Sequence, residues 1–256
     1  MSWLNKYSII FFDVLDSTDL EAKRMIKRGV RGNHVIVSAV QTRGKGRNGN
    51  FWHSPDGNLY FSIVFDHKNN LSNLSQLSLV TSLSCHEAMQ YFLNDKELSL
   101  FPKLFKIKWP NDLLLNDKKF CGILLQTLPC MDVHEDKIIN YLIIGVGMNL
   151  TNSPKNINYL TTSLKEEGIE HKYNDVFNKI MERFNENYKL WQAEGFSDIR
   201  SRWIQNTYNV GKKVFFDMKG KKNSGLFKDI DEDGQMVIEL ESGVLHKVTS
   251  CDVQVV

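Results

Sequence analysis

A glycine-rich basic loop carries the first residues that could bind a charged ligand. From Gln41 to Trp52 the chain reads QTRGKGRNGNFW, in which Arg43, Lys45 and Arg47 are alternate residues. Glycines let the backbone approach a ligand, and N–H groups combined with cations wrap phosphates. The loop lacks the order of a P-loop, and its match to G-x-G-x-x-G is followed by a predicted strand rather than a helix. On composition alone, a phosphate-binding loop and a mobile basic surface loop both remain open.

A second segment places an acid close to lysines. KWPND ends at Asp112, and KKFCGI follows from Lys118. A carboxyl near lysines is held in its charged form and could orient a hydroxyl or a metal. Gly122, inside an apolar strand, indicates the close approach of a ligand or of another backbone. A solvated hairpin turn is the alternative explanation for the pair Lys118 and Lys119.

A third segment, IGVGMN, ends at Asn149. Its glycines leave room on one face of a strand, and Asn149 could read the polar edge of a ligand; a tightly packed core strand is the alternative. His86 and Glu87 lack the second histidine of a zinc protease helix. The acidic turn at residues 229–233 lacks the spacing of a calcium loop.

Composition excludes several classes of protein. The chain has 256 residues, of which 42% are hydrophobic and 24% charged, which is ordinary for a globular protein. Its net charge of +2 is not the large positive charge that is typical of proteins that bind nucleic acid. The four cysteines have no metal-ligand spacing. No stretch approaches the roughly 20 apolar residues of a membrane span, and the N-terminus does not resemble a signal peptide. We expect a reduced, soluble, cytoplasmic protein.

The elements that must position these segments follow from hydrophobic periodicity. Runs of apolar and β-branched residues predict strands, and apolar residues that recur three and four positions apart predict helices. Thr18 and Glu21 fit a capping box that opens the first helix. Strands and helices do not alternate strictly, so we expect an α+β fold with a mixed, mostly antiparallel sheet flanked by helices. The expected strands are 7–12, 34–40, 58–65, 105–109, 113–115, 120–125 and 138–146. The expected helices are 18–29, 72–93, one from Tyr173 that ends before Gly195, and one around Trp203.

The pattern changes near residue 209. Short strands at 213–216, 225–230, 236–240 and 244–248 are separated by Asp-Gly and Ser-Gly turns, which is typical of a small β-barrel. We therefore expect a first domain over residues 1–208 and a second over 209–256. Because the three segments above end by Asn149, the second domain can only assist their chemistry, and we expect the first to fold without it.

GKGRNGNFWHSPDGNLYFS, KWPNDLLL, KKFCGILLQ and IIGVGMNL, in this order and at these separations, resemble the biotin–protein ligases. The resemblance implies a catalytic domain like that of class II tRNA synthetases, an SH3-like C-terminal domain, and a short form without an N-terminal DNA-binding domain. It also implies two steps. Biotin and ATP form biotinoyl-5′-AMP, and the biotinyl group then passes to one lysine of a biotin carboxyl carrier domain.

The resemblance further implies which residues bind biotin. Ser17, Thr18, Asp19 and Gln41 match the group that binds the ureido ring. Lys45, Gly46 and Arg47 lie in a loop that covers biotin, and Gly122 and Ile123 would line its pocket. Asp19 stands where asparagine is frequent in the family, which leaves its contact open. The set is Ser17, Thr18, Asp19, Gln41, Lys45, Gly46, Arg47, Lys119, Gly122 and Ile123.

ATP and the adenylate would be bound by Lys45, Arg47, Trp52, Lys119 and Asn149. The residues implied in catalysis are Lys119, Arg47 and Asp112. A cation at the α-phosphate lowers the barrier to adenylation, and a closing loop protects the anhydride from water. Mg²⁺ is expected, with no ligand assigned. Lys45 and Asn50 stand where many bacterial members have arginine, so position 50 supplies no cation.

Three alternatives remain open. A lipoate–protein ligase shares the sheet but generally lacks the G-x-G-R-x-G-x-x-W-x-S-P run. A non-catalytic module would bind biotin or a nucleotide without turnover. An RNA-binding protein using the basic loop is disfavoured by the near-neutral charge. As partners we expect a carboxylase carrier domain, biotin and ATP, with no DNA, no membrane, and a monomer or homodimer.

Overall fold

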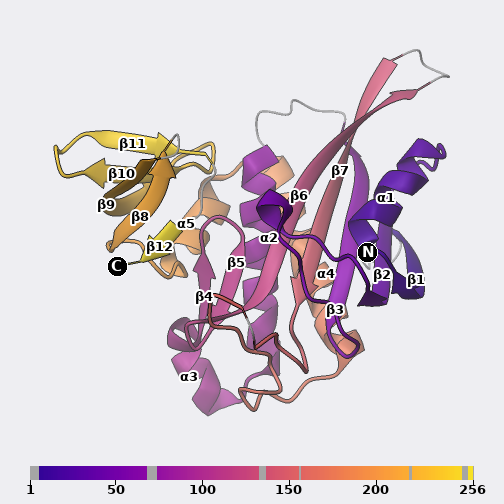
Figure 1. Cartoon of the computed structure of the whole chain (residues 1–256), viewed down its shortest axis with the longest axis horizontal. Coiled ribbons are helices and arrows are strands. Elements are labelled where there is room, and N and C mark those ends of the chain that lie inside the picture. Colours follow the sequence, from indigo (N-terminus) through magenta and orange to yellow (C-terminus); the bar gives the residue numbers. More distant parts are fainter. Residues whose placement is uncertain are drawn as a thin grey trace.

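A computed structural model describes residues 6–67, 74–132, 137–155, 157–218, 221–249 and 253–255. Over these residues a seven-stranded sheet runs in the order β1-β2-β3-β7-β6-β5-β4 (Figure 1). β1 (Ser8–Leu15) pairs parallel with β2 (His34–Gln41), and the other neighbouring pairs are antiparallel. The expected mixed, mostly antiparallel sheet is thus confirmed. The other strands are β3 (Leu59–His67), β4 (Phe105–Lys108), β5 (Asp112–Leu115), β6 (Lys118–Asp132) and β7 (Lys137–Met148).

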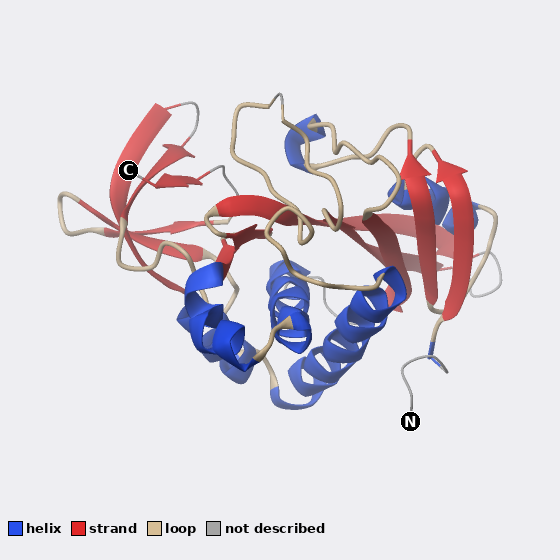
Figure 2. Cartoon of the chain, turned by 90° about the horizontal axis from the view of Figure 1, so that it is seen from below, coloured by secondary structure: helices blue, strands red, loops and turns tan. Residues whose placement is uncertain are grey.

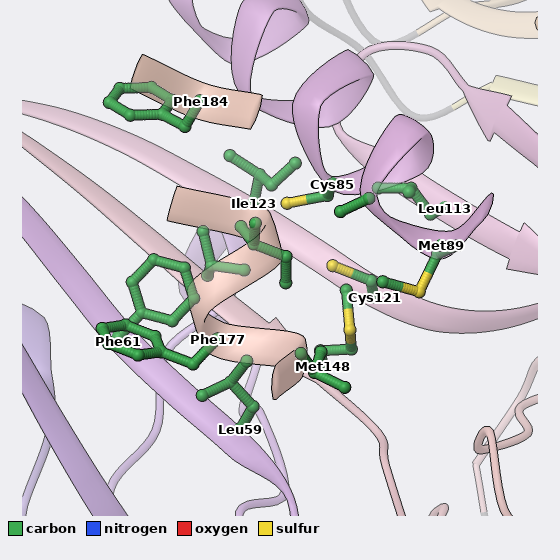
Figure 3. Close-up of a cluster of buried hydrophobic side chains, with 14 of the residues drawn as sticks. Leu59, Phe61, Cys85, Met89, Leu113, Cys121, Ile123, Met148, Phe177 and Phe184 are labelled. Atoms are coloured by element: carbon green, nitrogen blue, oxygen red, sulfur yellow. The ribbon is translucent and has the colours of Figure 1, made fainter. Parts of the chain in front are cut away.

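The two faces of this sheet have different covers, because successive residues of a strand point to opposite sides. Leu142 and Ile144 of β7 join the main core beneath α2 and α4, whereas Tyr141 and Ile143 pack with α1 (Figure 2). Figure 3 shows the main core around Phe61, Phe177 and Phe184, among other residues. The helices are α1 (Thr18–Lys27), α2 (Leu74–Ala88), α3 (Asp95–Leu104), α4 (Tyr173–Glu194) and α5 (Ser197–Gln205).

The first helix begins where the sequence predicts but not for the predicted reason. Ser17 occupies the N-cap position without a side-chain capping bond. Thr18 Oγ1 instead lies 2.7 Å from Ser62 Oγ, and the Glu21 carboxylate binds Arg24. The capping box is therefore wrong, because both of its side chains have tertiary or local partners that compete with the helix end.

Other differences concern strand length and one helix. β6 and β7 form a long hairpin that projects beyond the sheet (Figure 1), and β6 continues seven residues past the predicted end at Leu125. The turn before β6 forms as predicted, with Asn116 and Asp117 at positive φ. α3 was not predicted. The remaining helices and strands of the first 208 residues lie at their predicted places.

The C-terminal part is an antiparallel sheet. Over its described residues, five strands run in the order β11-β10-β9-β8-β12. No ladder joins β11 to β12 in this described part, so the sheet is open, and the closed barrel expected from the sequence is not formed. Its strands are β8 (Lys213–Met218), β9 (Lys221–Ile230), β10 (Met236–Leu240), β11 (Leu245–Val248) and β12 (Val253–Val255), the last of which was not predicted.

The C-terminal sheet docks on Trp109 of KWPND and on α2. Trp109 Nε1 donates to the carbonyl of Gly234 (3.2 Å), in the β9–β10 turn, and Gln76 Nε2 donates to the carbonyl of Glu232 (2.6 Å). Residues 206–208 connect the two parts and pair with Ile107 of β4. One hydrophobic cluster contains residues of both parts. Among the described helices, none is long and apolar enough to cross a membrane.

Candidate active site

A cavity of about 670 Å³ opens on the same face of the sheet as α1, beyond the part that this helix covers. A second cavity of about 350 Å³ shares Phe51, Trp52, Lys119 and Tyr159 with the first, and Asn149 lines it. The structure therefore brings every predicted site residue to one place. Those that line the larger cavity are Ser17, Thr18, Asp19, Gln41, Lys45, Gly46, Arg47, Trp52, Asp112, Lys119, Gly122 and Ile123.

Glycines in the two central strands make room for the Trp52 indole. Gly122 of β6 pairs with Gly147 of β7. A Cβ at Gly147 would lie 2.5 Å from Trp52 Nε1, and one at Gly122 would lie 2.9 Å from Trp52 Cζ3. Gly122 thus makes room for a side chain of this chain, and the residue also lines the larger cavity. Together these glycines allow Trp52 to lie directly on the strands.

Lys119 is held in the wall common to both cavities. Its Nζ lies 2.7 Å from Asp112 Oδ1 and 5.3 and 5.5 Å from the ring centroids of Trp52 and Tyr159. The side chains of Lys119 and Asp112 are 19% and 20% exposed. Lys118 instead pairs with Glu167 at 2.9 Å, away from the cavities. The two neighbouring lysines therefore differ in their partners and in their position relative to the cavities. The explanation that they form a solvated turn does not apply to Lys119.

A hydrogen bond between two side chains, one from each segment, joins the glycine-rich loop to the KWPND segment. Arg47 Nη1 donates to Asn111 Oδ1 (3.0 Å), and Asn111 Nδ2 donates to the carbonyl of Ile123 (2.6 Å). Within the loop, the Gly46 N–H donates to the carbonyl of Asn50 (2.7 Å). The Ile123 side chain belongs to the main core (Figure 3), although the residue borders the cavity. Opening this loop would break the contact between Arg47 and Asn111.

The part of the larger cavity beside the start of α1 is polar. The Thr18 N–H donates to Gln41 Oε1 (2.9 Å), and Gln41 Nε2 donates to Ser54 Oγ (3.0 Å). Asp19 is 4% exposed and accepts from Ser62 Oγ (2.6 Å). Burial raises the pKa of Asp19 to about 6, although its hydrogen bonds and nearby lysines act in the opposite direction. The segments that carry these groups are far apart in the sequence, and the sheet joins them.

Two buried polar atoms at the smaller cavity lack a partner within the described part of the chain. They are Trp52 Nε1, a donor, and Asn149 Oδ1, an acceptor. Buried polar groups are almost always hydrogen-bonded in folded proteins. A flat ligand that offers both an acceptor and a donor would satisfy the two atoms.

Sequence reasoning missed Ser62, Gln126 and Tyr159. Ser62 and Gln126 are polar residues within apolar strands, which is a signal that could have been used, and both contact Asp19. Tyr159 lies in an irregular segment and contacts Lys119 through its ring. No local pattern distinguishes it from other exposed tyrosines.

Comparisons with known proteins agree with this geometry. The model of the biotin/lipoate A/B protein ligase family matches residues 11–149, and that of the biotin protein ligase C terminal domain matches residues 210–256. The bifunctional ligase/repressor BirA of Bacillus subtilis is 27% identical, over 96% of this chain and 73% of its own length. The biotin–[acetyl-CoA-carboxylase] ligase of Paracoccus denitrificans is 25% identical, over 89% and 92%. The biotin protein ligase from Aquifex aeolicus in complex with biotin and ATP superposes with a TM-score of 0.77 at 28% identity, covering 97% of this chain and 98% of that one.

Proposed function

The chain belongs to the biotin/lipoate A/B protein ligase family, and on that basis we propose that it is an ATP-dependent biotin–protein ligase. The observation that carries the proposal is the position of Lys119 in the wall shared by the two cavities. In this proposal the larger cavity binds biotin and the smaller one binds adenine. Lys119 then lies where the biotin carboxylate and the α-phosphate of ATP must meet.

The first step joins these two groups. A carboxylate oxygen of biotin attacks the α-phosphorus of ATP, the bond to the β-phosphate oxygen breaks, and pyrophosphate leaves. Negative charge grows on the phosphoryl oxygens in the transition state, and a fixed cation stabilises it most when water is excluded. Asp112 holds the Lys119 ammonium at 2.7 Å, so this cation is already in place. In the second step a lysine amine of the acceptor attacks the biotinyl carbonyl, and AMP leaves.

The adenine site is supported by its unpaired atoms. Adenine is flat, with ring nitrogens that accept and an amino group that donates. Those groups complement Trp52 Nε1 and Asn149 Oδ1, which have no partner within the described residues.

Mg²⁺ would be held mainly by the phosphates of ATP, as is usual for this ion. Across the described residues, no three His, Cys, Asp or Glu side chains come together as a metal site. Asp112 borders the larger cavity beside Lys119 and could supply one carboxylate oxygen. Bound there, the ion would supply further positive charge at the phosphates.

As acceptor we propose the carrier domain of a carboxylase, since relatives are named as ligases of acetyl-CoA carboxylase. Incubation with ATP and either biotin or lipoate, followed by mass analysis of a carrier domain, tests the function directly. A mass increase with biotin supports it, and an increase with lipoate alone would favour the lipoate ligase alternative. A cytoplasmic location, the lack of a DNA or membrane partner, and a monomeric or dimeric state remain predictions.

Arg47→Gly is expected to release the adenylate at least about tenfold faster, because the charge-assisted bond to Asn111 is lost and the loop gains backbone freedom. Adenylate formation should partly survive, since Lys119 is untouched. The measurement is the dissociation rate of preformed adenylate, together with biotin labelling of an unrelated bystander protein.

Arg43→Gly is the matched control, because Arg43 lies in the same loop but does not line either cavity. Unchanged release and background labelling in the Arg47 variant would exclude a retention role for that residue. Trp52 would then be the next residue to test.

Gly147→Ala is expected to raise the KM for ATP about tenfold or more, because its Cβ would displace the Trp52 indole from the strands. The KM for ATP is measured by pyrophosphate release, and the position of the indole by tryptophan fluorescence. Gly225→Ala is a matched control: its Cβ would lie 2.5 Å from Ile238 Cγ2, a similar clash in the C-terminal sheet. An equal rise in KM in both variants would show that the effect is one of stability.

A further inference from the structure

Asn58 holds the turn that follows Asn149 through four hydrogen bonds. It directly precedes β3, and the register of β3 with β7 places it beside the end of β7. Its Oδ1 accepts from the three backbone N–H groups of residues 150–152, at 2.9, 2.9 and 3.1 Å. Its Nδ2 donates to the carbonyl of Asn152 (2.9 Å). One side-chain amide thus satisfies three consecutive donors and one acceptor of the turn.

The position of this turn depends on Asn58, although Asn58 itself touches no ligand site. The residue is 1% exposed and lines neither cavity. Without its side chain, the N–H of Leu150, which is equally buried, would lose its acceptor in the interior of the protein. Buried donors are almost always hydrogen-bonded, and leaving one unpaired is costly. The turn would therefore have to move until its N–H groups found other acceptors.

The turn at residues 150–152 joins two parts of the wall of the smaller cavity. Asn149 lies directly before it, and Pro154 and Lys155 follow shortly after it; all three line that cavity. Asn149 Nδ2 donates to the carbonyl of Thr162 (3.1 Å), which fixes the orientation of this amide and leaves Oδ1 for a ligand. Because Oδ1 can only accept, it binds a base that presents an amino group and opposes one that presents a carbonyl oxygen.

We propose that Asn58 is a positioning residue for base selection: by holding the turn at residues 150–152, it keeps Asn149 Oδ1 where that atom accepts from the 6-amino group of adenine. Hypoxanthine carries a carbonyl oxygen in place of this amino group, so it sets one acceptor against another. The inference rests on the proposed adenine site and adds the residue that gives this site its preference. The polar groups beside the start of α1 are held by partners of their own, Gln41 and Ser62, so biotin binding should not depend on Asn58.

The test compares two adenylate analogues that cannot transfer biotin. Biotinol-5′-AMP carries adenine, and biotinol-5′-IMP carries hypoxanthine; biotin alone reports on the larger cavity. The dissociation constant of each compound is measured by calorimetry. For the wild type we expect the adenine analogue to bind at least about tenfold more tightly than the hypoxanthine analogue, because the latter leaves Asn149 Oδ1 facing an oxygen.

Asn58→Ala should bind the adenine analogue at least about tenfold more weakly and should prefer it to the hypoxanthine analogue by no more than about threefold. Its affinity for biotin should stay within about twofold of the wild type, since distant sites act independently. Asn58→Asp should keep most of the preference, because a carboxylate oxygen can still accept the three N–H bonds. The one bond that it loses is to the carbonyl of Asn152, an exposed residue.

The Asn58→Ala variant is expected to fold, because Thr151 Oγ1 also donates to the carbonyl of Gly57 (3.0 Å) and joins the same two segments. Near-ultraviolet circular dichroism checks this. Asn58→Ser is the milder variant should alanine prevent folding: its shorter side chain cannot reach all three N–H groups, and the preference should fall at least about threefold. Asn187→Ala is the matched control, since Asn187 of α4 is 5% exposed, bonds Ser84 and Glu87, and lines neither cavity.

The arms of the test separate this inference from the proposed function. A wild type that binds biotinol-5′-AMP no more tightly than biotin contradicts the proposed function, since no nucleotide site then contributes. A wild type that binds the two analogues equally contradicts the inference alone, and so does an unchanged preference for adenine in the folded Asn58 variants. An equal loss of preference in Asn187→Ala, or a parallel loss of biotin affinity in Asn58→Ala, would show a general effect on stability and would also overturn the inference.

Discussion

Replacing Lys119 with alanine is expected to slow adenylate formation at least about 100-fold, as the loss of one preorganised charge-stabilising group does in comparable sites. The ammonium lies in the wall shared by the two cavities, at 2.7 Å from Asp112. Without it, Asp112 would also place an uncompensated negative charge next to the phosphates. The measurement is the single-turnover rate of pyrophosphate release with saturating biotin and ATP.

Lys118→Ala provides the matched control, because it removes the same charge from the neighbouring residue of the same strand. Lys118 pairs with Glu167 and lines neither cavity. We expect its adenylation rate to stay within about twofold of the wild type, because the charge that is lost lies outside both cavities. Equal rates in the two variants would mean that Lys119 has no special part in the chemistry.

Removing residues 210–256 is expected to prevent the remaining chain from folding into a stable monomer. The deletion takes Val214, Phe216 and Phe227 out of a buried cluster that contains Trp109 and Trp203 of the first part. Each large apolar side chain contributes about 1.5–3 kcal/mol by its burial, and a whole domain is stable by only about 5–15 kcal/mol. The shared cluster therefore predicts a different outcome from the sequence, which suggested an independent first domain.

Circular dichroism and thermal unfolding of residues 1–209 measure this effect. A cooperative transition within about 5 °C of the full chain would contradict it. Trp109→Phe in the full chain is a milder variant, since it keeps an aromatic ring in the cluster but removes the indole N–H that binds the Gly234 carbonyl. Trp203→Phe removes a comparable bond to Ser82 within the first part. If the contact of the C-terminal turn matters to the site, only the Trp109 variant should change adenylation.

The strands of the catalytic sheet could be predicted because their apolar runs are long and nearly continuous. Residues 138–146 are the best example, and β7 (Lys137–Met148) contains them. The hairpin turn at Asn116 and Asp117 was also evident, since both residues tolerate positive φ. Motif order then indicated which segments meet at one site, and the cavities bring all of the predicted residues together.

What could not be predicted depends on contacts between distant segments. Asp19 meets Ser62 and Gln126, which are 43 and 107 residues away, and a single sequence holds no record of that pairing. The same applies to the Trp52 indole, which fills the space beside Gly122 and Gly147. The capping box failed for this reason too, because Thr18 makes a tertiary hydrogen bond instead.

The connection between the two parts has a consequence for solubility. β4 is the last strand of the central sheet, and the unpaired edge of such a strand is a template on which other chains can add. Here the N–H of Ile107 donates to the carbonyl of Asn206 (2.8 Å), and its carbonyl accepts from the N–H of Tyr208 (2.8 Å). Residues 206–208 therefore also cover that edge and protect it from strand addition by other molecules. Any change that loosens residues 206–208 would expose a place for strand addition between molecules, even where the catalytic residues are intact.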